Sequence, residues 1–301
     1  MASVMTVHIK PQPTPEQLVA DLVLLLDLEP RGGDRFIGRA KRDGFGRVFG
    51  GQAIAQALGA ARRTVPEGRH THSLHAYFLR GGTEGVPIEF RVKRDFDGGS
   101  FSNRRVVASQ RGEPILNLIA SFQKPQEGLS HQLPQLPDVP PPEELRPDAE
   151  IRREVAEQLP DGPMRRAMLR PRAFDFRSVE PRDWPAPQKQ EPRAHVWFRT
   201  VASLPDDRPI HRAVLAYVSD FQLLPTALHP HGLSFHLGQV KAASLDHAIW
   251  FHGDFRGDDW MLYVTDSPWT GLARGFGRGQ IFTRDGRLVA SVAQEGMMRA
   301  V

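Results

Sequence analysis

The sequence repeats one order of elements on either side of a proline-rich stretch, and this repeat limits the possible folds more than any other feature. Residues 49–123 read as a helix of small residues followed by strands that end in a hairpin, and residues 196–294 follow the same order. Two matching pairs lie 174 positions apart, Gly112 with Gly286 and Arg104 with Arg278. The sequence therefore predicts a duplicated α+β unit, in which each antiparallel sheet curls round a central helix.

The second of the two predicted central helices carries an acidic residue, which the first lacks. The first, over residues 53–61, consists mostly of small residues, which let a sheet approach its backbone closely. The second, near residues 213–225, has Val214 and Phe221 on one apolar face but carries Asp220 in its last turn. A carboxylate there meets the negative end of the helix dipole, which disfavours it by roughly 0.3–1 kcal/mol. We therefore interpret Asp220 as a functional residue.

Two further polar side chains lie on predicted strands downstream of Asp220. Ser244 begins a strand over residues 244–252. Gln294 ends the second strand of a hairpin that turns at Asp285-Gly286, a dipeptide typical of hairpin turns. We predict that the fold brings Asp220, Ser244 and Gln294 together.

The proline-rich stretch divides the chain into three parts. Fourteen of the 26 prolines fall between residues 125 and 192, where charged runs replace strand-like alternation. A short helix is expected within this stretch at 148–158, and a helix at 15–28, capped by Thr14, is expected before the first repeat. The predicted parts are an N-terminal repeat at 1–124, a linker at 125–172 and a C-terminal repeat at 173–301.

Composition excludes several classes of protein. Apolar residues make up 40% and charged residues 25% of the chain, which is typical of a globular protein with a sizeable core. Without cysteine, the chain has no disulfides, thiol nucleophiles or cysteine metal ligands. The net charge of +4 is mild, and no basic run interleaved with aromatic residues indicates a nucleic-acid partner. Residues 22–26 form an apolar run too short to enter and span a membrane, no signal peptide is recognisable, and we expect a cytoplasmic protein.

Seven motifs follow one another along the chain. They are Phe49-Gly-Gly-Gln-Ala-Ile-Ala-Gln-Ala-Leu58, His72-Ser-Leu-His-Ala-Tyr-Phe-Leu-Arg-Gly81, Ser100-Phe-Ser-Asn-Arg-Arg-Val106, Tyr217-Val-Ser-Asp220, Ser244-Leu-Asp-His-Ala-Ile-Trp-Phe-His252, Ala273-Arg-Gly-Phe276 and Val292-Ala-Gln-Glu-Gly-Met-Met-Arg299. In this order they resemble the motifs of type II (TesB-like) acyl-CoA thioesterases, and the resemblance runs from about residue 18 to residue 300, apart from the proline-rich linker. The resemblance implies a double hot-dog fold, hydrolysis of fatty acyl-CoA to free fatty acid and CoA, no metal or other cofactor, and a homo-oligomer.

The resemblance also implies roles for the three polar residues. Family members use an aspartate, a threonine or serine, and a glutamine to hold and activate a water molecule, and these correspond to Asp220, Ser244 and Gln294. Asp220 would be the general base, a role worth typically 10²–10⁴ in rate. Serine stands here where many members carry threonine; it keeps the hydroxyl and is expected only to weaken the positioning of the side chain.

Five other residues are candidates for contacts with the substrate. The backbone N–H groups of Gly50 and Gly51, at the entry to the first central helix, would meet the carbonyl oxygen of the thioester. His72 is a candidate on the following strand, with a hydrogen-bonded structural histidine as the alternative interpretation. Arg274 and Arg278 are candidates for the CoA phosphates because a planar guanidinium matches phosphate.

Other interpretations stay open at the level of the sequence. Asp220 could be a solvated residue at a helix end. A further set of residues suggests metal ligands, but its spacing matches no known site and a solvated loop is the better interpretation; the set is His247, His252, Asp254, Asp258 and Asp259. Hydration of an enoyl-CoA would need a paired Asp and His, and no histidine lies at a helical neighbour position of Asp220. A catalytically silent acyl-CoA-binding protein would have no need of a buried acid.

Overall fold

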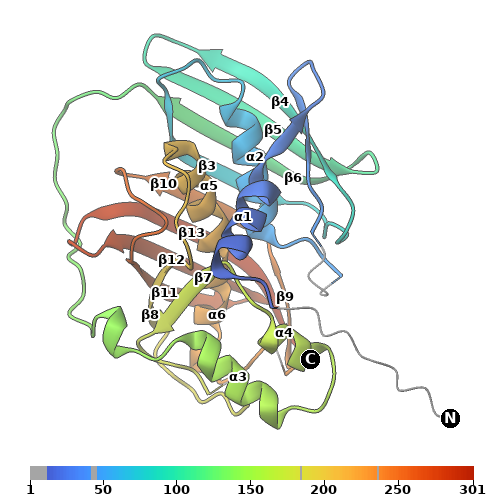
Figure 1. Cartoon of the computed structure of the whole chain (residues 1–301), viewed down its shortest axis with the longest axis vertical. Helices are drawn as coiled ribbons and strands as arrows, with labels where there is room; N and C mark the ends of the chain where they lie inside the picture. The colour runs from blue at the N-terminus through green and yellow to red at the C-terminus, as the bar shows by residue number, and fades with distance from the viewer. Residues whose placement is uncertain (1–11, 42–45, 184, 236) are drawn as a thin grey trace.

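The computed structural model describes residues 12–41, 46–183, 185–235 and 237–301, in which the strands form one large antiparallel sheet (Figure 1). The first half contains α1 (Pro15–Leu26), β1 (Leu28–Pro30), β2 (Arg35–Gly38), α2 (Gly50–Arg62), β3 (His70–Phe78), β4 (Ile88–Asp97), β5 (Phe101–Gln110) and β6 (Glu113–Gln123). The connection contains η1 (Pro142–Glu144), α3 (Asp148–Gln158) and α4 (Pro163–Leu169). The second half contains β7 (Phe174–Ser178), β8 (Arg193–Thr200), α5 (Arg208–Val218), η2 (Ser219–Phe221), α6 (Leu223–Ala227), η3 (His229–His231), β9 (Val240–Ser244), β10 (Asp246–Phe251), β11 (Met261–Gly271), β12 (Arg274–Thr283) and β13 (Leu288–Ala300).

The order of the strands is symmetric about the centre of the sheet. It runs β1-β2-β4-β5-β6-β3 through the first half and β10-β13-β12-β11-β8-β7 through the second, while β9 pairs with β13 off this path. The central pair is β3 with β10, in which Leu74 lies opposite Ile249. The predicted α+β double hot-dog fold is confirmed, and its two sheets are hydrogen-bonded edge to edge into one.

The repeat is closer in topology than in individual residues. Gly112 and Gly286 both lie at hairpin turns with positive φ, 81° and 86°. Arg104, in contrast, is fully buried on β5, whereas Arg278 lies on the exposed face of β12. The spacing of 174 residues therefore aligns the two hairpins but not the faces of the strands before them.

The helix α2 is the central helix of the first half and reaches further than the predicted 53–61. The strands β3, β4, β5 and β6 pack around it, and Ala55, Ala57 and Ala60 have no exposed surface. At its N-terminus, a Cβ on Gly51 would lie 2.2 Å from the Tyr217 carbonyl oxygen of α5. This glycine therefore allows the start of α2 to rest against the end of α5.

The second central helix is interrupted where the sequence predicted a single element. α5 ends at Val218, the 3-10 turn η2 follows, and Pro225 lies inside α6 instead of ending the helix. Proline is tolerated in the first turn of α6 because the N–H that it lacks would have no intrahelical acceptor there. Gly277 of β12 lets α6 lie close to the sheet, since a Cβ at this position would be 2.9 Å from the Leu223 carbonyl oxygen.

Two other boundaries differ from the prediction. α1 has the predicted Thr14 cap, because the Thr14 hydroxyl accepts from the Gln17 N–H, but it ends at Leu26 where β1 is about to begin. The strand predicted over residues 244–252 is two strands, β9 and β10, and both pair with β13. The break at Leu245 leaves Ser244 as the last residue of β9, opposite Gly296.

The proline-rich connection is anchored to the second half. The α3 helix has the predicted bounds, and α4, which was not predicted, packs against it below the sheet in Figure 1. The indole N–H of Trp197 donates to the Pro140 carbonyl oxygen at 2.9 Å, and Ser178 of β7 donates from its N–H to the carboxylate of Asp148. The division at 1–124, 125–172 and 173–301 stays a prediction.

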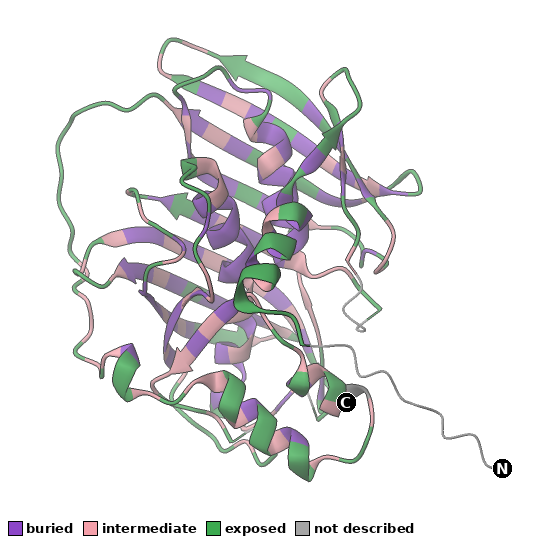
Figure 2. Ribbon diagram, viewed as in Figure 1, coloured by how far each residue is buried: buried purple, intermediate pink, exposed green. Residues whose placement is uncertain are grey.

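The core lies between the sheet and the central helices. Figure 2 shows buried residues along α2, α5 and the strand faces turned toward them, whereas α3 is largely exposed. Within the described ranges, no helix is long and apolar enough to cross a membrane.

Candidate active site

Asp220 lies in η2, which directly follows α5 in the chain and packs against α2 in space. Its Oδ2 accepts a hydrogen bond from the Gly51 N–H at 2.9 Å, and its Oδ1 accepts one from Gln294 Nε2 at 2.8 Å. The unfavourable position at the end of its own helix is therefore offset by the N-terminus of α2, where backbone N–H groups and the helix dipole favour a carboxylate. The N-terminus comes from the other half of the chain.

The three residues predicted as a catalytic set lie in contact. Besides Asp220, Gln294 Nε2 also donates to the Ser244 Oγ at 2.6 Å. The two hydrogens of this amide are thus both used, one on the carboxylate and one on the hydroxyl. The Ser244 hydroxyl hydrogen is in turn given to the Asp220 carboxylate, and Ser244 Oγ keeps one lone pair that can accept from a further donor.

Burial changes the chemistry of the Asp220 carboxyl. Only 6% of the side chain is exposed. Desolvation raises the pKa of Asp220 from 3.8 to about 6, against the hydrogen bonds from Gln294, Gly51 and Ser244, which lower it. A carboxyl with a pKa near 6 is mostly ionised at pH 7 and is more basic than an exposed aspartate, as a general base requires.

His247 is a member of the site that the sequence analysis did not assign. This fully buried residue of β10 has Nδ1 3.2 Å from Gln294 Oε1 and Nε2 2.9 Å from Ser219 Oγ. Because Gln294 Oε1 can only accept, Nδ1 carries the proton and Nε2 accepts from the Ser219 hydroxyl. Burial lowers the pKa of His247 to about 4, so the ring is neutral at pH 7. The ring therefore fixes the Gln294 amide with its nitrogen toward Asp220.

A signal for His247 was present in the sequence. Alternation in a strand puts His247, Ile249 and Phe251 on the same face, and all three are buried. The sequence analysis looked for a histidine only at the helical neighbour positions of Asp220, and none lies there. His247 comes from the sheet instead, and its Nδ1 lies 4.0 Å from Asp220 Oδ1.

A cavity of about 1270 Å³ opens beside the catalytic set. Asp220 and Ser244 line it, together with Gly50, whereas Gln294 and His247 lie behind them. One wall consists of apolar and aromatic side chains, and another consists of residues of the connection between the halves. The apolar wall includes Leu18, Leu22, Leu25, Phe49, Phe174 and Phe221. Such a cavity can bury an apolar chain with its polar end at Asp220.

The two glycines predicted to meet the substrate are both near the site but differ in what they can do. The Gly51 N–H already donates to Asp220, so it is not free for a substrate carbonyl. The Gly50 N–H, at the first position of α2, has no acceptor among the described residues and borders the cavity. Of the pair, Gly50 is the available donor.

The other three predicted contacts lie away from the cavity. His72 hydrogen-bonds through Nε2 to the Ser121 Oγ at 2.8 Å, which fits the structural interpretation. Arg274 lies over Trp269 with its guanidinium carbon 5.7 Å from the ring centre. Arg278 donates to both carboxylate oxygens of Asp266 at 2.8 Å. The strand β12 turns its glycines toward α6 and these two arginines outward, and none of the three residues lines the cavity.

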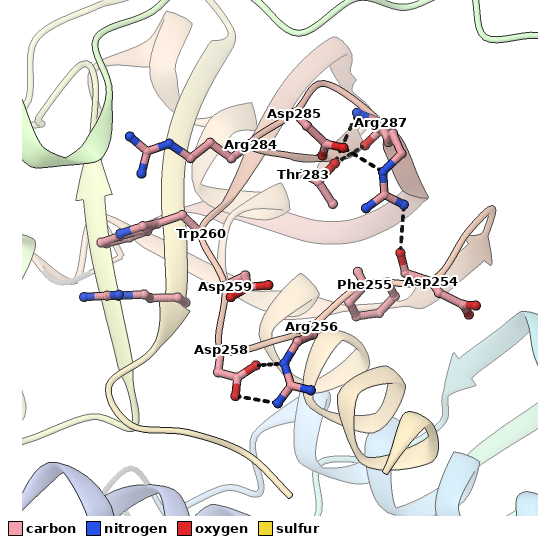
Figure 3. Close-up of a pocket in the computed structure, with 11 residues that line it drawn as sticks. Asp254, Phe255, Arg256, Asp258, Asp259, Trp260, Thr283, Arg284, Asp285 and Arg287 are labelled. Carbon is pink, nitrogen blue, oxygen red and sulfur yellow. Dashed lines mark hydrogen bonds and ion pairs between the residues drawn. The ribbon is translucent and has the colours of Figure 1, made fainter. Parts of the chain in front are cut away.

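The residues considered as metal ligands have other partners. Apart from His247, they lie at or near a second cleft of about 600 Å³ (Figure 3), in which Arg256 donates to both oxygens of Asp258. Asp254 pairs with Arg208 and Arg212, and His252 hydrogen-bonds to Ser291. No group of three potential metal ligands occurs in the part of the chain that the structure describes.

Comparison with known proteins gives the family. A family model for acyl-CoA thioesterase matches residues 178–297, and one for the acyl-CoA thioesterase N-terminal domain matches residues 39–123. The chain belongs to the acyl-CoA thioesterase family, as the seven motifs predicted.

Individual relatives agree with this assignment along most of the chain. Human acyl-coenzyme A thioesterase 8 is 39% identical over 282 residues, which cover 91% of this chain and 88% of the relative. Acyl-CoA thioesterase 2 of Haemophilus influenzae is 38% identical, with 94% and 98% covered. The crystal structure of an acyl-CoA thioesterase II from Mycobacterium marinum has 40% identity and a TM-score of 0.74, covering 92% of this chain and 97% of its own.

Proposed function

We propose that this chain hydrolyses fatty acyl-CoA thioesters with a water molecule activated by Asp220, and that no acyl group becomes attached to the protein. The observation that carries the proposal is the Asp220 carboxylate, with its raised pKa, at the wall of an apolar cavity. Membership of the acyl-CoA thioesterase family supports the substrate class.

In this mechanism the water molecule occupies the cavity side of Asp220, within reach of the Ser244 hydroxyl. Asp220 takes a proton from the water as the water oxygen attacks the carbonyl carbon of the thioester. The Gly50 N–H supplies a donor for the negative charge that develops on the carbonyl oxygen. When the carbon–sulfur bond breaks, the proton on Asp220 passes to the leaving thiolate, so the products are the free acid and CoA.

Ser244 and Gln294 have different parts in the proposal. Ser244 orients the water through the remaining lone pair of its Oγ, which accepts a hydrogen bond from the water. Gln294 acts from behind, because its amide nitrogen already donates to Asp220 at 2.8 Å and to Ser244 at 2.6 Å. It keeps both groups within reach of one water molecule, which lowers the entropic cost of reaching the transition state.

The alternative reactions have less support. A hydratase would need a histidine that exchanges protons with the substrate, but the His247 ring is fully buried and both of its nitrogens are hydrogen-bonded within the protein. A silent binding protein would gain nothing from a buried carboxyl whose ionised form is destabilised by desolvation.

The test is the release of free CoA thiol from acyl-CoAs of several chain lengths, carried out in ¹⁸O-labelled water. We expect release with one ¹⁸O atom in each molecule of acid. Intact acyl-CoA that stays bound would instead identify a binding protein, and 3-hydroxyacyl-CoA formed from an enoyl-CoA would identify a hydratase. With protein in excess over substrate, an acyl group retained on the quenched protein would contradict direct attack by water.

We further propose that copies of the chain associate through the outer face of β3, β6 and β10. This face carries exposed apolar side chains at Tyr77, Ile119 and Trp250, with exposed fractions of 63%, 47% and 37%. Light scattering after gel filtration tests this, and Ile119→Lys is expected to yield the monomer. A mass unchanged by Ile119→Lys would exclude this face.

A cytoplasmic location also stays a proposal, which cell fractionation tests.

A further inference from the structure

The cavity beside Asp220 contains an arginine that the proposed mechanism does not use. Arg172 follows α4 and borders the cavity, with its guanidinium carbon 5.6 Å from the centre of the Phe221 ring. Phe221 is the residue after Asp220, and Arg172, Phe221 and Asp220 all line the same cavity. No hydrogen bond or ion pair of its guanidinium is found among the described residues.

The charges around Arg172 do not balance it. The carboxylate that attracts it is Asp148, whose two oxygens already accept from the N–H and the hydroxyl of Ser178, each at 2.9 Å. Arg152, a second cation beside the same acid, is buried and donates to backbone carbonyl oxygens. Desolvation, and then repulsion by Arg152, lowers the pKa of Arg172 to about 10, a value at which it is still charged at pH 7. Charges removed from water are normally paired, so this corner of the cavity lacks an anion.

We propose that Arg172 binds an anionic oxygen group of the substrate and thereby helps to select which thioesters the cavity accepts. The inference rests on the proposed function, since the ligand is taken to be an acyl-CoA. A guanidinium forks onto carboxylate or phosphate through two parallel N–H donors, and either group can come from this substrate. One source is the CoA phosphates, which the whole pantetheine arm separates from the thioester. The other is a carboxylate at the far end of the acyl chain.

The connection between the halves would then contribute to specificity. Arg172 belongs to the segment after α4, and α3 and α4 together support the wall that contains Arg152 and Arg172. A stretch that looked like a linker in the sequence therefore carries a binding group into the cavity.

The test measures the binding of thioether analogues, which cannot be hydrolysed. Three ligands separate the two sources: S-hexyl-CoA has the phosphates, S-(5-carboxypentyl)-CoA has the phosphates and a distal carboxylate, and S-hexyl-pantetheine has neither. Arg172→Gln is compared with wild type by calorimetry, beside Arg172→Lys, which keeps the charge but loses the fork. The matched control is Arg199→Gln, because Arg199 also stacks on an aromatic ring, Trp260, at 4.5 Å, but lines the second cleft.

A loss of about 10- to 100-fold in affinity is expected for the anionic ligand that Arg172 contacts, the range for a hydrogen bond to a charged group. Weaker binding of both CoA ligands, with the pantetheine ligand unchanged, identifies the phosphates. Weaker binding of the carboxypentyl ligand alone identifies the distal carboxylate. Arg172→Lys is expected to lose less than Arg172→Gln, and Arg199→Gln to lose nothing.

Two results would overturn the assignment. Unchanged affinities for all three ligands would show that Arg172 contacts no substrate anion, and an equal loss for all three would show that it only supports the wall. Failure of the proposed function is separate: wild type that binds these analogues but releases no CoA from thioesters would refute hydrolysis and leave the role of Arg172 measurable.

Discussion

Replacing Asp220 by asparagine should increase the stability of the folded protein more at high pH than at low pH. Desolvation raises the pKa of Asp220 from 3.8 to about 6 in the folded chain. Because the folded-state pKa lies above that of the unfolded chain, the ionised carboxylate destabilises the fold. That destabilisation is absent well below pH 3.8, grows as the pH rises from 3.8 to about 6, and is complete at higher pH.

The size of the effect follows from the pKa shift. A rise from 3.8 to about 6 corresponds to about 3 kcal/mol of lost stability at pH 8, of which about half is already present at pH 5. Asparagine does not titrate, but its NH₂ group would face either the Gly51 N–H or Gln294 Nε2. The donor that faces the NH₂ group would lose its hydrogen-bond acceptor. This loss does not change with pH, so it cancels when the two pH values are compared. Asp220→Asn should therefore gain about 1–2 kcal/mol relative to wild type between pH 5 and pH 8.

The assay is urea unfolding of both proteins at pH 5 and pH 8. A single protein concentration is used, because association of folded chains makes the free energy of unfolding depend on concentration. The difference between the two free energies of unfolding should shift in favour of the variant as the pH rises. A difference independent of pH would refute the reasoning, because it would mean that burial does not raise the pKa of Asp220.

Three further results are expected. The rate constant kcat/KM should rise with pH to a plateau, with an apparent pKa of about 6 for the free enzyme, because the base must be ionised; a profile flat from pH 5 to 8 would contradict this. His247→Leu should lower kcat by about 10- to 100-fold, because it leaves the Gln294 amide oxygen without its donor. His247→Asn can still donate a hydrogen bond to this oxygen and should retain more activity. Equal losses of kcat in the two variants would argue against an orienting role of His247. Gly51→Ala should destabilise the fold by about 3 kcal/mol or more, because its Cβ would lie 2.2 Å from a backbone oxygen. Gly59→Ala in the same helix meets nothing closer than 3.7 Å and should be neutral or stabilising by up to about 1 kcal/mol. Urea unfolding of both variants compares them.

The contact among Asp220, Ser244 and Gln294 was predictable because each of these residues breaks a local rule or lies in a recognisable motif. Asp220 stood out as a carboxylate at the wrong end of an apolar helix, and the order of elements gave the duplicated fold. The motifs around Ser244 and Gln294 supplied the rest. Contacts across the two halves could not be predicted in this way, because the Gly51 N–H and Asp220 are 169 residues apart and only the packed fold brings them together.

The differences between prediction and structure have the same physical origin. Arg274 and Arg278 were candidates on chemical type alone, and the direction in which β12 faces places them away from the cavity. The connection between the halves was interpreted as a linker from its prolines, but a proline-rich chain can also be held in place by other contacts. Its anchors, such as the bond from Trp197 to the Pro140 carbonyl, involve backbone groups that every residue carries, so composition gives no sign of them.

The most direct test of the mechanism is the turnover number of Asp220→Asn beside its affinity for S-hexyl-CoA. The account predicts that kcat for CoA release falls by about 10²–10⁴, the usual contribution of a general base, while the affinity for the thioether stays close to that of wild type. Equal turnover by the variant and wild type, at equal affinity, would contradict the assignment of Asp220 as the base.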